Sequence, residues 1–256
     1  MLATKAGGFA SAPWNDGGRA VTETAAPIEV FYWSTPNGRK VSVMLEEIGV
    51  PYTVAFVDIG AREQWTPEFR AVSPNHQIPA IRDPDGPGGA PITVFESGAI
   101  LLYLARKFGR FYPTDDERRR VEVEEWLFWQ VASFGPLLGQ AHHFNLAAAE
   151  EVPYAIERYG AIARRLYATL DARLAGRDYV AAGEFTVADI ALFGWVQRHE
   201  RQRIDLADYP NVRAWFERVG ARPGVRRGMA VIKPGHDDRA VLNPKRIPGP
   251  PSAASG

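Results

Sequence analysis

Residues 73–81 read Ser-Pro-Asn-His-Gln-Ile-Pro-Ala-Ile, and residues 94–104 read Val-Phe-Glu-Ser-Gly-Ala-Ile-Leu-Leu-Tyr-Leu. In the first stretch a short loop leads through Ile78-Pro79 into an apolar strand. An X-Pro bond at such an entry is a candidate cis peptide that leaves its neighbours' backbone groups free for a ligand. The second stretch contains the end of a strand, 92–95, which stops at Glu96-Ser97-Gly98. Together the two stretches predict a site that holds a substrate at the strand ends.

A helix follows the second strand, because apolar residues recur at helical spacing from Ile100 to Phe108. We predict Ser97 as its N-cap, so that the Ser97 hydroxyl and the unpaired first-turn amides hold a carboxylate. Glu96 beside this anion site would hold an ammonium group, and such a pair suits an α-amino acid. The alternative is that Ser97 only caps its helix and that Glu96 is a solvated acid.

The residues before this site form an alternating pattern. We predict strands over 28–33 and 52–59, a helix from about Val41 that ends at Gly49, and a loop with a short helix over 60–72. With the two later strands and their helix, the order is βαβ, α, β, β, α, which is the thioredoxin-like order. Function is then expected where the first βα turn meets the loop before Ile78-Pro79.

The second half of the chain reads as helical. After a Gly-, Pro- and Asp-containing linker over 109–115, helices are predicted over 116–130, 153–174 and 210–219. Thr186 and Asp189 form a capping box, which we assign to folding. The predicted fold class is an α/β thioredoxin-like N-terminal domain over 28–108, followed by an all-α helical-bundle C-terminal domain over 116–225. Residues 1–27 are expected to be a flexible arm and residues 226–256 a tail.

Between the first two helices of this half lie two adjacent histidines, His142 and His143. Helix neighbours point about 100° apart, and neither histidine has a ligand-type partner one turn away, so we predict no metal site. His143 and Phe144 are expected to line a pocket wall or to pack structurally. Arg158 lies on the following helix, where a solvated salt bridge is the alternative to a binding role.

The amino-acid composition argues against several classes of function. The chain has 256 residues, with 30 basic and 30 acidic residues and no cysteine. Balanced charge gives no indication of a nucleic-acid or membrane-surface partner, and no apolar run approaches the length needed to span a bilayer. Residues 1–27 lack the pattern of a secretory signal, so we expect a cytoplasmic protein. Without cysteine there can be no disulfide, no zinc-thiolate site and no cysteine nucleophile supplied by the protein.

Several longer motifs carry a resemblance to a known family. They are Thr-Pro-Asn-Gly-x-Lys-Val, Ser-Pro-Asn-x-x-Ile-Pro-Ala, Phe-Glu-Ser-Gly-Ala-Ile-Leu-Leu-Tyr-Leu, Trp-Leu-Phe-Trp-Gln and Tyr-Ala-Ile-Glu-Arg-Tyr. In this order the chain resembles the cytosolic glutathione transferases over residues 28–225, and within them the bacterial nu class, which is related to a yeast prion protein. The resemblance implies the glutathione transferase fold, glutathione as cosubstrate and a homodimer.

The resemblance also implies which residues hold the first glutathione. Ile78, beside a cis Pro79, would pair its backbone with the cysteinyl part. Glu96 and Ser97 would bind the γ-glutamyl end. The class uses Thr and Asn of the first turn at the glutathione sulfur, and a catalytic cysteine of other relatives would lie in the same turn.

A second glutathione, or the disulfide form, would be held by Gln64 and Arg158. Gln77 stands where some members of the class carry Lys before Ile-Pro. This difference and the longer arm and tail are departures that bear on the second glutathione.

Thr35 and Asn37 match the first-turn positions. A free thiol with a pKa of about 8.5 is mostly protonated at neutral pH, and hydroxyl, amide and backbone N–H donors lower that pKa by stabilising the thiolate. The alternative is that Thr-Pro-Asn-Gly only turns the chain and caps the helix. Tyr32 lies within the apolar strand and is interpreted as core or wall.

The function implied is reduction of small disulfides by glutathione, without a protein cysteine. One alternative is conjugation of glutathione to an electrophile, which uses the same thiolate. Another is a non-catalytic, glutathione-binding regulatory protein that retains the fold.

Overall fold

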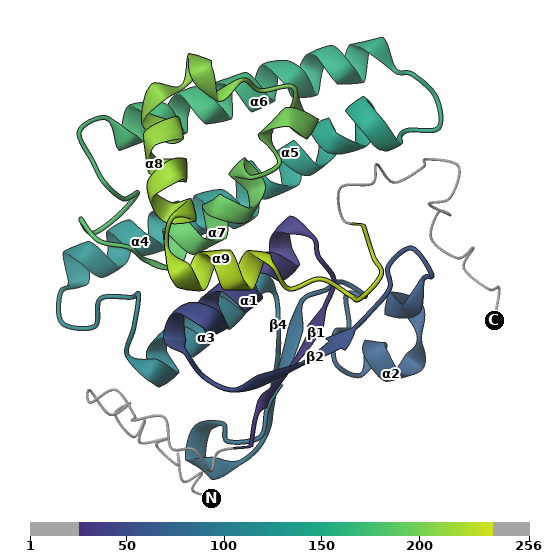
Figure 1. The fold of residues 1–256 in the computed structure, drawn as a ribbon, viewed down its shortest axis with the longest axis vertical. Coiled ribbons are helices and arrows are strands. Elements are labelled where there is room, and N and C mark those ends of the chain that lie inside the picture. The colour runs from purple at the N-terminus through teal and green to yellow at the C-terminus, as the bar shows by residue number, and fades with distance from the viewer. Residues whose placement is uncertain (1–25, 238–256) are drawn as a thin grey trace, which may run out of the picture.

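The computed structural model describes residues 26–237. The expected N-terminal arm lies almost entirely outside these residues, as does the tail beyond residue 237. A four-stranded sheet and its helices form one half of the described structure, and the remaining helices pack over the sheet's helical face (Figure 1). The predicted fold class, an α/β domain followed by an all-helical domain, is confirmed.

The elements of the first half follow the predicted order βαβ, α, β, β, α. The strands β1 and β2 end at Tyr32 and Phe56, earlier than the expected 33 and 59. Two short 3-10 turns, η1 and η2, interrupt the loops. The elements are β1 (Ile28–Tyr32), α1 (Pro36–Ile48), β2 (Tyr52–Phe56), η1 (Glu63–Trp65), α2 (Pro67–Arg70), β3 (Ala80–Asp83), η2 (Pro87–Gly89), β4 (Ile92–Phe95) and α3 (Ser97–Phe108).

The sheet brings the end of β1, the start of β3 and the end of β4 together at one end of the strands, which we call the sheet edge. Its order is β2-β1-β3-β4, with β1 parallel to β2 and antiparallel to β3, and with β3 antiparallel to β4. Phe31 pairs with Ala80, and Ala80 pairs with Phe95. The turn after β1, the loop before β3 and the turn after β4 therefore lie side by side.

Helix α1 is the centre of the molecule. Thr35 caps its N-terminus, Pro36 occupies the first turn, and Gly49 ends it in the left-handed region at φ 81°, where glycine has no steric penalty. All residues from Gly38 to Leu45 are buried. A helix that is buried around its whole circumference must be packed against other elements on every side. Figure 1 shows why: α1 lies between the sheet and the helices α7 and α9.

The second half of the described residues is helical throughout. Its last helix, α9, runs past residue 225, where the tail was expected to begin, because Val225 and Gly228 are buried and Gly228 packs against the backbone of Val43 on α1. The elements are α4 (Glu117–Trp129), η3 (Gln130–Phe134, π-helical), α5 (Gly135–His142), η4 (His143–Ala147, π-helical), α6 (Pro153–Leu174), α7 (Val187–Val196), η5 (His199–Gln202), η6 (Leu206–Asp208), α8 (Pro210–Gly220) and α9 (Pro223–Met229).

Helix α7 is the core of the helical half, with every residue buried. The predicted capping box starts it: Asp189 accepts from the Thr186 amide at 2.9 Å, and also from Trp215 Nε1 at 2.8 Å and the Val180 amide at 3.0 Å. Burial raises the pKa of Asp189 to about 6. These bonds tie the start of α7 to the loop at Val180 and to α8, and the other end of α7 reaches the first βα turn. None of the helices within residues 26–237 is long and apolar enough to cross a bilayer.

Candidate functional site

The loop before β3 has the predicted backbone form. The peptide bond between Ile78 and Pro79 is cis, as expected. Ser73 Oγ donates to the Gln77 carbonyl at 2.8 Å, which ties the ends of the loop together. Pro79 is buried, while Ile78 is partly exposed. This loop lies at the sheet edge that the first βα turn and Glu96-Ser97 also occupy.

Thr35 has the capping role that the sequence left open. Its hydroxyl oxygen accepts from the Gly38 amide at 3.1 Å. A threonine hydroxyl has two acceptor lone pairs and one O–H donor. Capping uses an acceptor position and leaves the O–H available, so the cap and a donor role toward a ligand are compatible.

Asn37 is held by the helical half of the protein. Its Oδ1 accepts from Trp195 Nε1 on α7 at 3.0 Å. The contact is possible because the helix comes very close: a Cβ on Gly194 would lie 2.7 Å from the Pro36 carbonyl oxygen. Sequence analysis did not identify Trp195, since nothing local relates it to the first turn.

The prediction that Ser97 is the N-cap of α3 is wrong. Glu96 occupies the cap position at φ 68°, and neither residue makes a side-chain cap bond. The chain turns so sharply after β4 that α3 begins at Ser97, one residue earlier than the pattern suggested. Glu96 remains exposed, whereas Ser97 is buried with 6% of its surface accessible. The first-turn amides of α3 still face the end of β4, as orphan donors of a helix start do.

Lys40 lies behind Ser97 and was missed by sequence analysis. Its Nζ donates to Ser97 Oγ at 3.1 Å and to Gln130 Oε1 at 2.5 Å. Only 2% of Lys40 is accessible. Burial lowers the pKa of Lys40 to about 7, and the negative charge of Glu96 partly opposes this. A lysine in an amphipathic helix normally reads as a surface residue. The one available signal was that Lys40 lies one turn beyond Asn37 on α1.

Gln130 joins the two halves of the protein at this point. It is fully buried in the π-helical turn η3, and π-turns within helices often occur at functional sites. Its Nε2 has no hydrogen-bond partner among residues 26–237. The helical half thus contacts the site twice, through Gln130 behind Ser97 and through Trp195 beside Asn37.

Gln64 lies close to Gln77 because its carbonyl contacts His76, the residue before Gln77. The Gln64 carbonyl lies 3.1 Å from His76 Nδ1, and the Trp65 ring stacks on His76 with centroids 4.4 Å apart. Gln77 is exposed, and its Oε1 accepts from Asn75 Nδ2 at 3.1 Å. The structure therefore places both glutamines beside the cis-proline loop.

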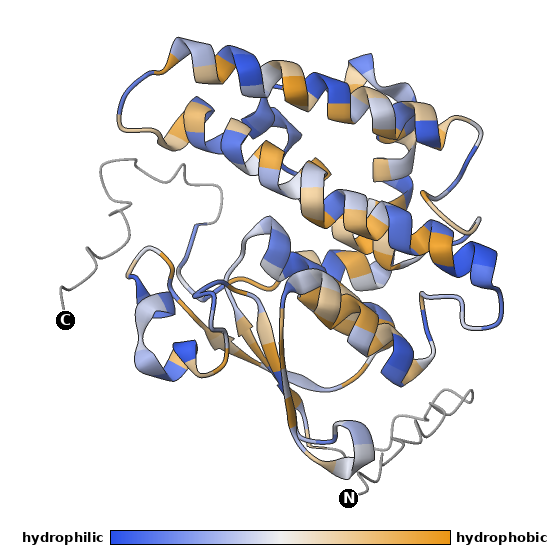
Figure 2. Ribbon diagram, turned by 180° about the vertical axis from the view of Figure 1, so that it is seen from behind, coloured by the Kyte–Doolittle hydropathy of each residue, from blue (hydrophilic) through white to orange (hydrophobic). Residues whose placement is uncertain are grey.

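Arg158, His143 and Phe144 belong to the far end of the helical half. Arg158 is exposed on α6, while Phe144 stacks on the neighbouring Tyr159 with ring centroids 5.5 Å apart. The edge of Phe144 also meets His143 at 4.9 Å. These contacts show structural packing, and the pocket-wall role stays a prediction. Figures 1 and 2 show the α5–α6 connection and α2 on the same side of the molecule.

Metal ligands do not gather in the described part of the chain. No group of three or more His, Asp or Glu side chains able to hold a metal ion occurs among residues 26–237. His142 is engaged elsewhere: it lies against Trp195, and burial lowers its pKa to about 4.

Two family models match the chain. One, described as the glutathione S-transferase N-terminal domain, matches residues 35–107, and the other, the glutathione S-transferase C-terminal domain, matches residues 154–223. A relative named disulfide-bond oxidoreductase YfcG, from Escherichia coli, is 47% identical over 80% of this chain and 95% of its own length.

Solved structures are similar as well. A glutathione transferase family member from Pseudomonas fluorescens, with two glutathione bound, superposes with a TM-score of 0.76 at 40% identity, covering 81% of this chain and 94% of that one. A glutathione transferase from Pseudomonas putida, with one glutathione disulfide bound per subunit, has a TM-score of 0.77 at 37% identity, with coverages of 82% and 94%.

Proposed function

The chain belongs to the glutathione S-transferase family, and from this premise we propose that it is a glutathione-dependent disulfide-bond reductase of the nu class. The observation that carries the proposal is its 47% identity, over nearly the whole relative, to a disulfide-bond oxidoreductase. The chain has no cysteine, so the reacting thiols must come from glutathione. A cytoplasmic location is part of the same proposal.

In this proposal the first glutathione lies along the edge where the strand ends meet. Its γ-glutamyl carboxylate is received by Ser97 and the first-turn amides of α3, and its ammonium group by the exposed Glu96. Ile78 pairs its backbone with the cysteinyl part. The sulfur then faces the first βα turn, where the Thr35 hydroxyl oxygen accepts from the Gly38 amide and the Asn37 oxygen accepts from Trp195. The Thr35 O–H and the Asn37 NH₂ group are donors, and donors stabilise a thiolate.

The reaction follows from two sulfurs held in line. The stabilised thiolate attacks one sulfur of the substrate disulfide, forming a mixed disulfide and expelling the other sulfur as a thiolate, which takes up a proton. A second glutathione thiolate then attacks the glutathione sulfur of the mixed disulfide. The products are glutathione disulfide and two substrate thiols, with two electrons moved from the two glutathiones to the substrate. Gln64, Gln77 and Arg158 hold the second glutathione.

Structures of similar proteins support the proposal that two glutathione molecules bind. The similar Pseudomonas fluorescens protein has two glutathione bound, and the Pseudomonas putida protein has glutathione disulfide bound. Gln64 contributes an observation of its own, because its Oε1 is buried without a partner among the described residues and is therefore ready to accept from a ligand.

The test is steady-state reduction of hydroxyethyl disulfide by glutathione, run beside conjugation of a chloronitrobenzene. Strong reduction with weak conjugation is the expected result. The reverse would make the chain a conjugating transferase, which is the first alternative. Activity in neither assay, with retention on immobilised glutathione, would favour the regulatory protein.

Replacing Ser97 by Ala is expected to weaken glutathione binding, because the carboxylate loses a hydroxyl donor. Stability should also fall by about 1 to 3 kcal/mol, since buried Lys40 loses an acceptor. Isothermal titration with glutathione measures the affinity. Ser42→Ala is the matched control: Ser42 is also buried and hydrogen-bonded, to the Gly228 carbonyl at 2.8 Å, but lies away from the strand ends. Equal affinities for wild type and Ser97→Ala would return Ser97 to a purely structural role.

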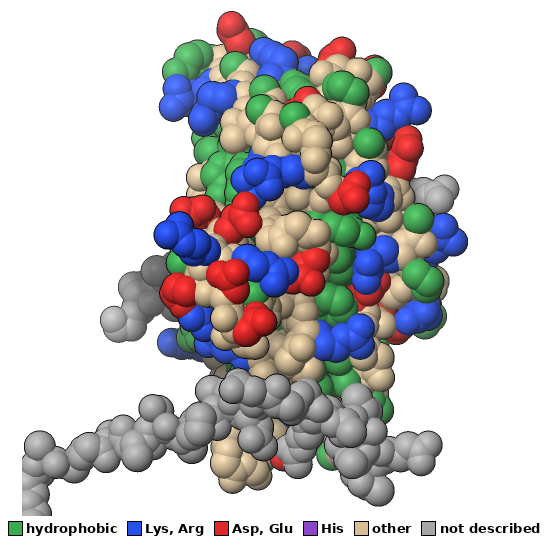
Figure 3. Space-filling view, turned by 90° about the vertical axis from the view of Figure 1, so that its left-hand side faces the viewer, with side chains coloured by type: hydrophobic (Ala, Val, Ile, Leu, Met, Phe, Trp, Pro, Cys, Tyr) green, Lys and Arg blue, Asp and Glu red, His purple; other side chains and the backbone are tan. Residues whose placement is uncertain are grey.

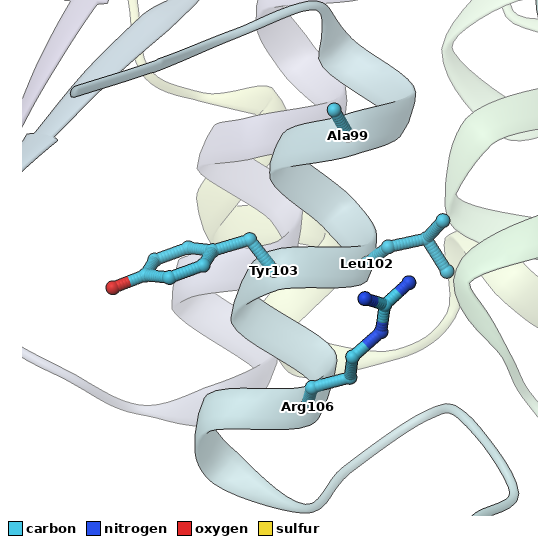
Figure 4. Close-up of a pocket in the computed structure, with 4 residues that line it drawn as sticks. All are labelled: Ala99, Leu102, Tyr103 and Arg106. Atoms are coloured by element: carbon cyan, nitrogen blue, oxygen red, sulfur yellow. The ribbon is translucent and has the colours of Figure 1, made fainter. Parts of the chain in front are cut away.

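The expected homodimer is also a proposal. Phe128 on α4 is 58% exposed and Phe95 is 39% exposed, and burying such side chains would favour association. The start of α3, just after Phe95, approaches the end of α4, because Gly98 packs against Val131. The surface of α3 also has a hollow, which is lined by Ala99, Leu102, Tyr103 and Arg106 (Figure 4). Figure 2 shows α3 as largely hydrophobic.

The side of the molecule at the left of Figure 1 carries charges of both signs. Figure 3 shows basic and acidic side chains interspersed on either side of a narrow hydrophobic strip. A single-sign field, which would attract nucleic acid, is not seen on this face.

Replacing Phe128 by Glu is expected to convert the dimer to a monomer, because a charge would be buried in the apolar contact. Sedimentation velocity measures the oligomeric state. Tyr154→Glu is the matched control, since Tyr154 is 72% exposed but lies on α6, away from α3 and α4. A wild-type monomer, or a Phe128→Glu dimer, would contradict the use of this face.

A further inference from the structure

Trp195 contacts Asn37 in a way that determines the orientation of the Asn37 amide. An indole Nε1–H is a donor and never an acceptor, whereas an asparagine side chain offers an acceptor oxygen on one side and an NH₂ donor on the other. With Trp195 Nε1 3.0 Å from the Asn37 oxygen, the bond exists only in one orientation of the amide. The flipped orientation would bring two donors together, so the NH₂ group must point away from the indole.

Trp195 is itself held rigidly. Only 7% of its surface is accessible, and it lies on α7, whose residues are all buried. The side chain of Gln202 donates to the Trp195 carbonyl at 2.9 Å. On α5, glycine makes room for the ring: a Cβ at Gly135 would lie 3.2 Å from Trp195 Nε1, and one at Gly139 would lie 3.4 Å from the ring. The indole therefore cannot rotate to another partner without displacing α5.

We infer that Trp195 is a positioning residue, which keeps the NH₂ group of Asn37 directed at the glutathione sulfur. The inference rests on the proposed function, in which Asn37 stabilises the thiolate. It adds that the donor character of the site is imposed by the helical half of the chain. An isolated Asn37 on the first turn would present its oxygen to the sulfur about as readily as its NH₂ group, and an oxygen would repel a thiolate.

The test is a double-mutant cycle of Trp195→Phe and Asn37→Ala, read as the pKa of the enzyme-bound glutathione thiol by its thiolate absorbance. Phe keeps an aromatic ring and removes the donor. Trp195→Phe is expected to raise the thiol pKa and to lower kcat by about five-fold, the size of one hydrogen bond, with little change in KM. In the Asn37→Ala background it should have no further effect on the thiol pKa.

Trp215→Phe is the matched control. Trp215 is a buried tryptophan of the same domain whose Nε1 also donates, to Asp189, and it has no contact with Asn37. Its loss should lower stability and leave the thiol pKa unchanged. If Trp195→Phe behaves in the same way, or shifts the thiol pKa equally in the Asn37→Ala background, the inference is overturned.

Asn37→Asp gives a second test that does not depend on a Trp195 variant folding. Asp keeps the oxygen that accepts from Trp195 and places a second carboxylate oxygen where the NH₂ group was. The thiol pKa should therefore rise further than in Asn37→Ala, and an equal or smaller rise would overturn the inference. The proposed function fails separately: in that case Asn37→Ala itself leaves the thiol pKa at the wild-type value.

Discussion

The double variant Thr35→Ala/Asn37→Ala is expected to lose about 100-fold or more of its disulfide-reductase turnover, since one preorganised donor at a developing anion is typically worth about 10² to 10³ in kcat. In the proposed function both side chains donate to the glutathione sulfur, while the Thr35 oxygen accepts from the Gly38 amide and the Asn37 oxygen accepts from Trp195. Without them the bound thiol returns toward its free pKa of about 8.5, so most of it is protonated at neutral pH. The measurement is kcat for hydroxyethyl disulfide, together with the thiolate absorbance of the glutathione complex.

The pH profile separates this effect from a damaged fold. Raising the pH through the thiol pKa restores the thiolate, so the variant should recover activity toward about pH 9 if only ionisation was lost. Loss of the Thr35 cap should cost about 1 kcal/mol of stability, measured by urea unfolding. Thr35→Ser is the control, because it retains both the cap and the O–H donor. Turnover that is the same in the double variant and the wild type would refute the role of this turn.

Local signals account for what the sequence predicted correctly. The order of strands and helices, the Ile78-Pro79 cis bond and the Thr186–Asp189 capping box each depend on residues close together in the chain. The meeting of three strand ends followed from that order, because parallel and antiparallel pairing in a thioredoxin-like sheet leaves little choice. The same reasoning placed Thr35, Ile78 and Glu96 on neighbouring turns.

The site residues that sequence analysis missed are those whose contacts lie far away in the chain. Lys40 meets Ser97 and Gln130 across 57 and 90 positions, and Trp195 meets Asn37 across 158. No periodicity in α1 distinguishes a lysine that faces solvent from one covered by a second domain. The Ser97 cap was mispredicted for a related reason: serine is a common N-cap, but the sharp turn after β4 gave that position to Glu96.

Lys40→Met is expected to change how stability depends on pH. The pKa of Lys40 is lowered by burial from its ordinary 10.5 to about 7 in the folded protein. Between these values the unfolded chain holds a proton that the folded chain lacks, so wild-type stability should rise with pH from about 7 upward. Below pH 7 both states are protonated, and the folded protein bears the full cost of a buried charge. Met has a similar length and no charge, so this rise should vanish in the variant.

The size of the effect makes the slope measurable. A lowering from 10.5 to about 7 corresponds to roughly 5 kcal/mol as an upper bound, at 1.36 kcal/mol per pKa unit. Met also leaves Ser97 Oγ and Gln130 Oε1 without their donor, which costs about 1 to 3 kcal/mol for each buried group. Absolute stability at one pH is therefore a sum of opposing effects, and only the difference in slope between the two proteins isolates the Lys40 charge.

Urea unfolding of wild type and Lys40→Met from about pH 6 to about pH 9.5 gives that difference. Tyr52 and Tyr103, whose pKa values burial raises, titrate above this range and are common to both proteins. Glu96→Gln gives an independent check: Glu96 is the charge that opposes the lowering, so removing it should lower the pKa of Lys40 further and extend the rise in stability to lower pH. Parallel curves for wild type and Lys40→Met would show that Lys40 keeps its proton across this range in the folded protein. The ammonium behind Ser97 would then be a permanent positive charge at the carboxylate site.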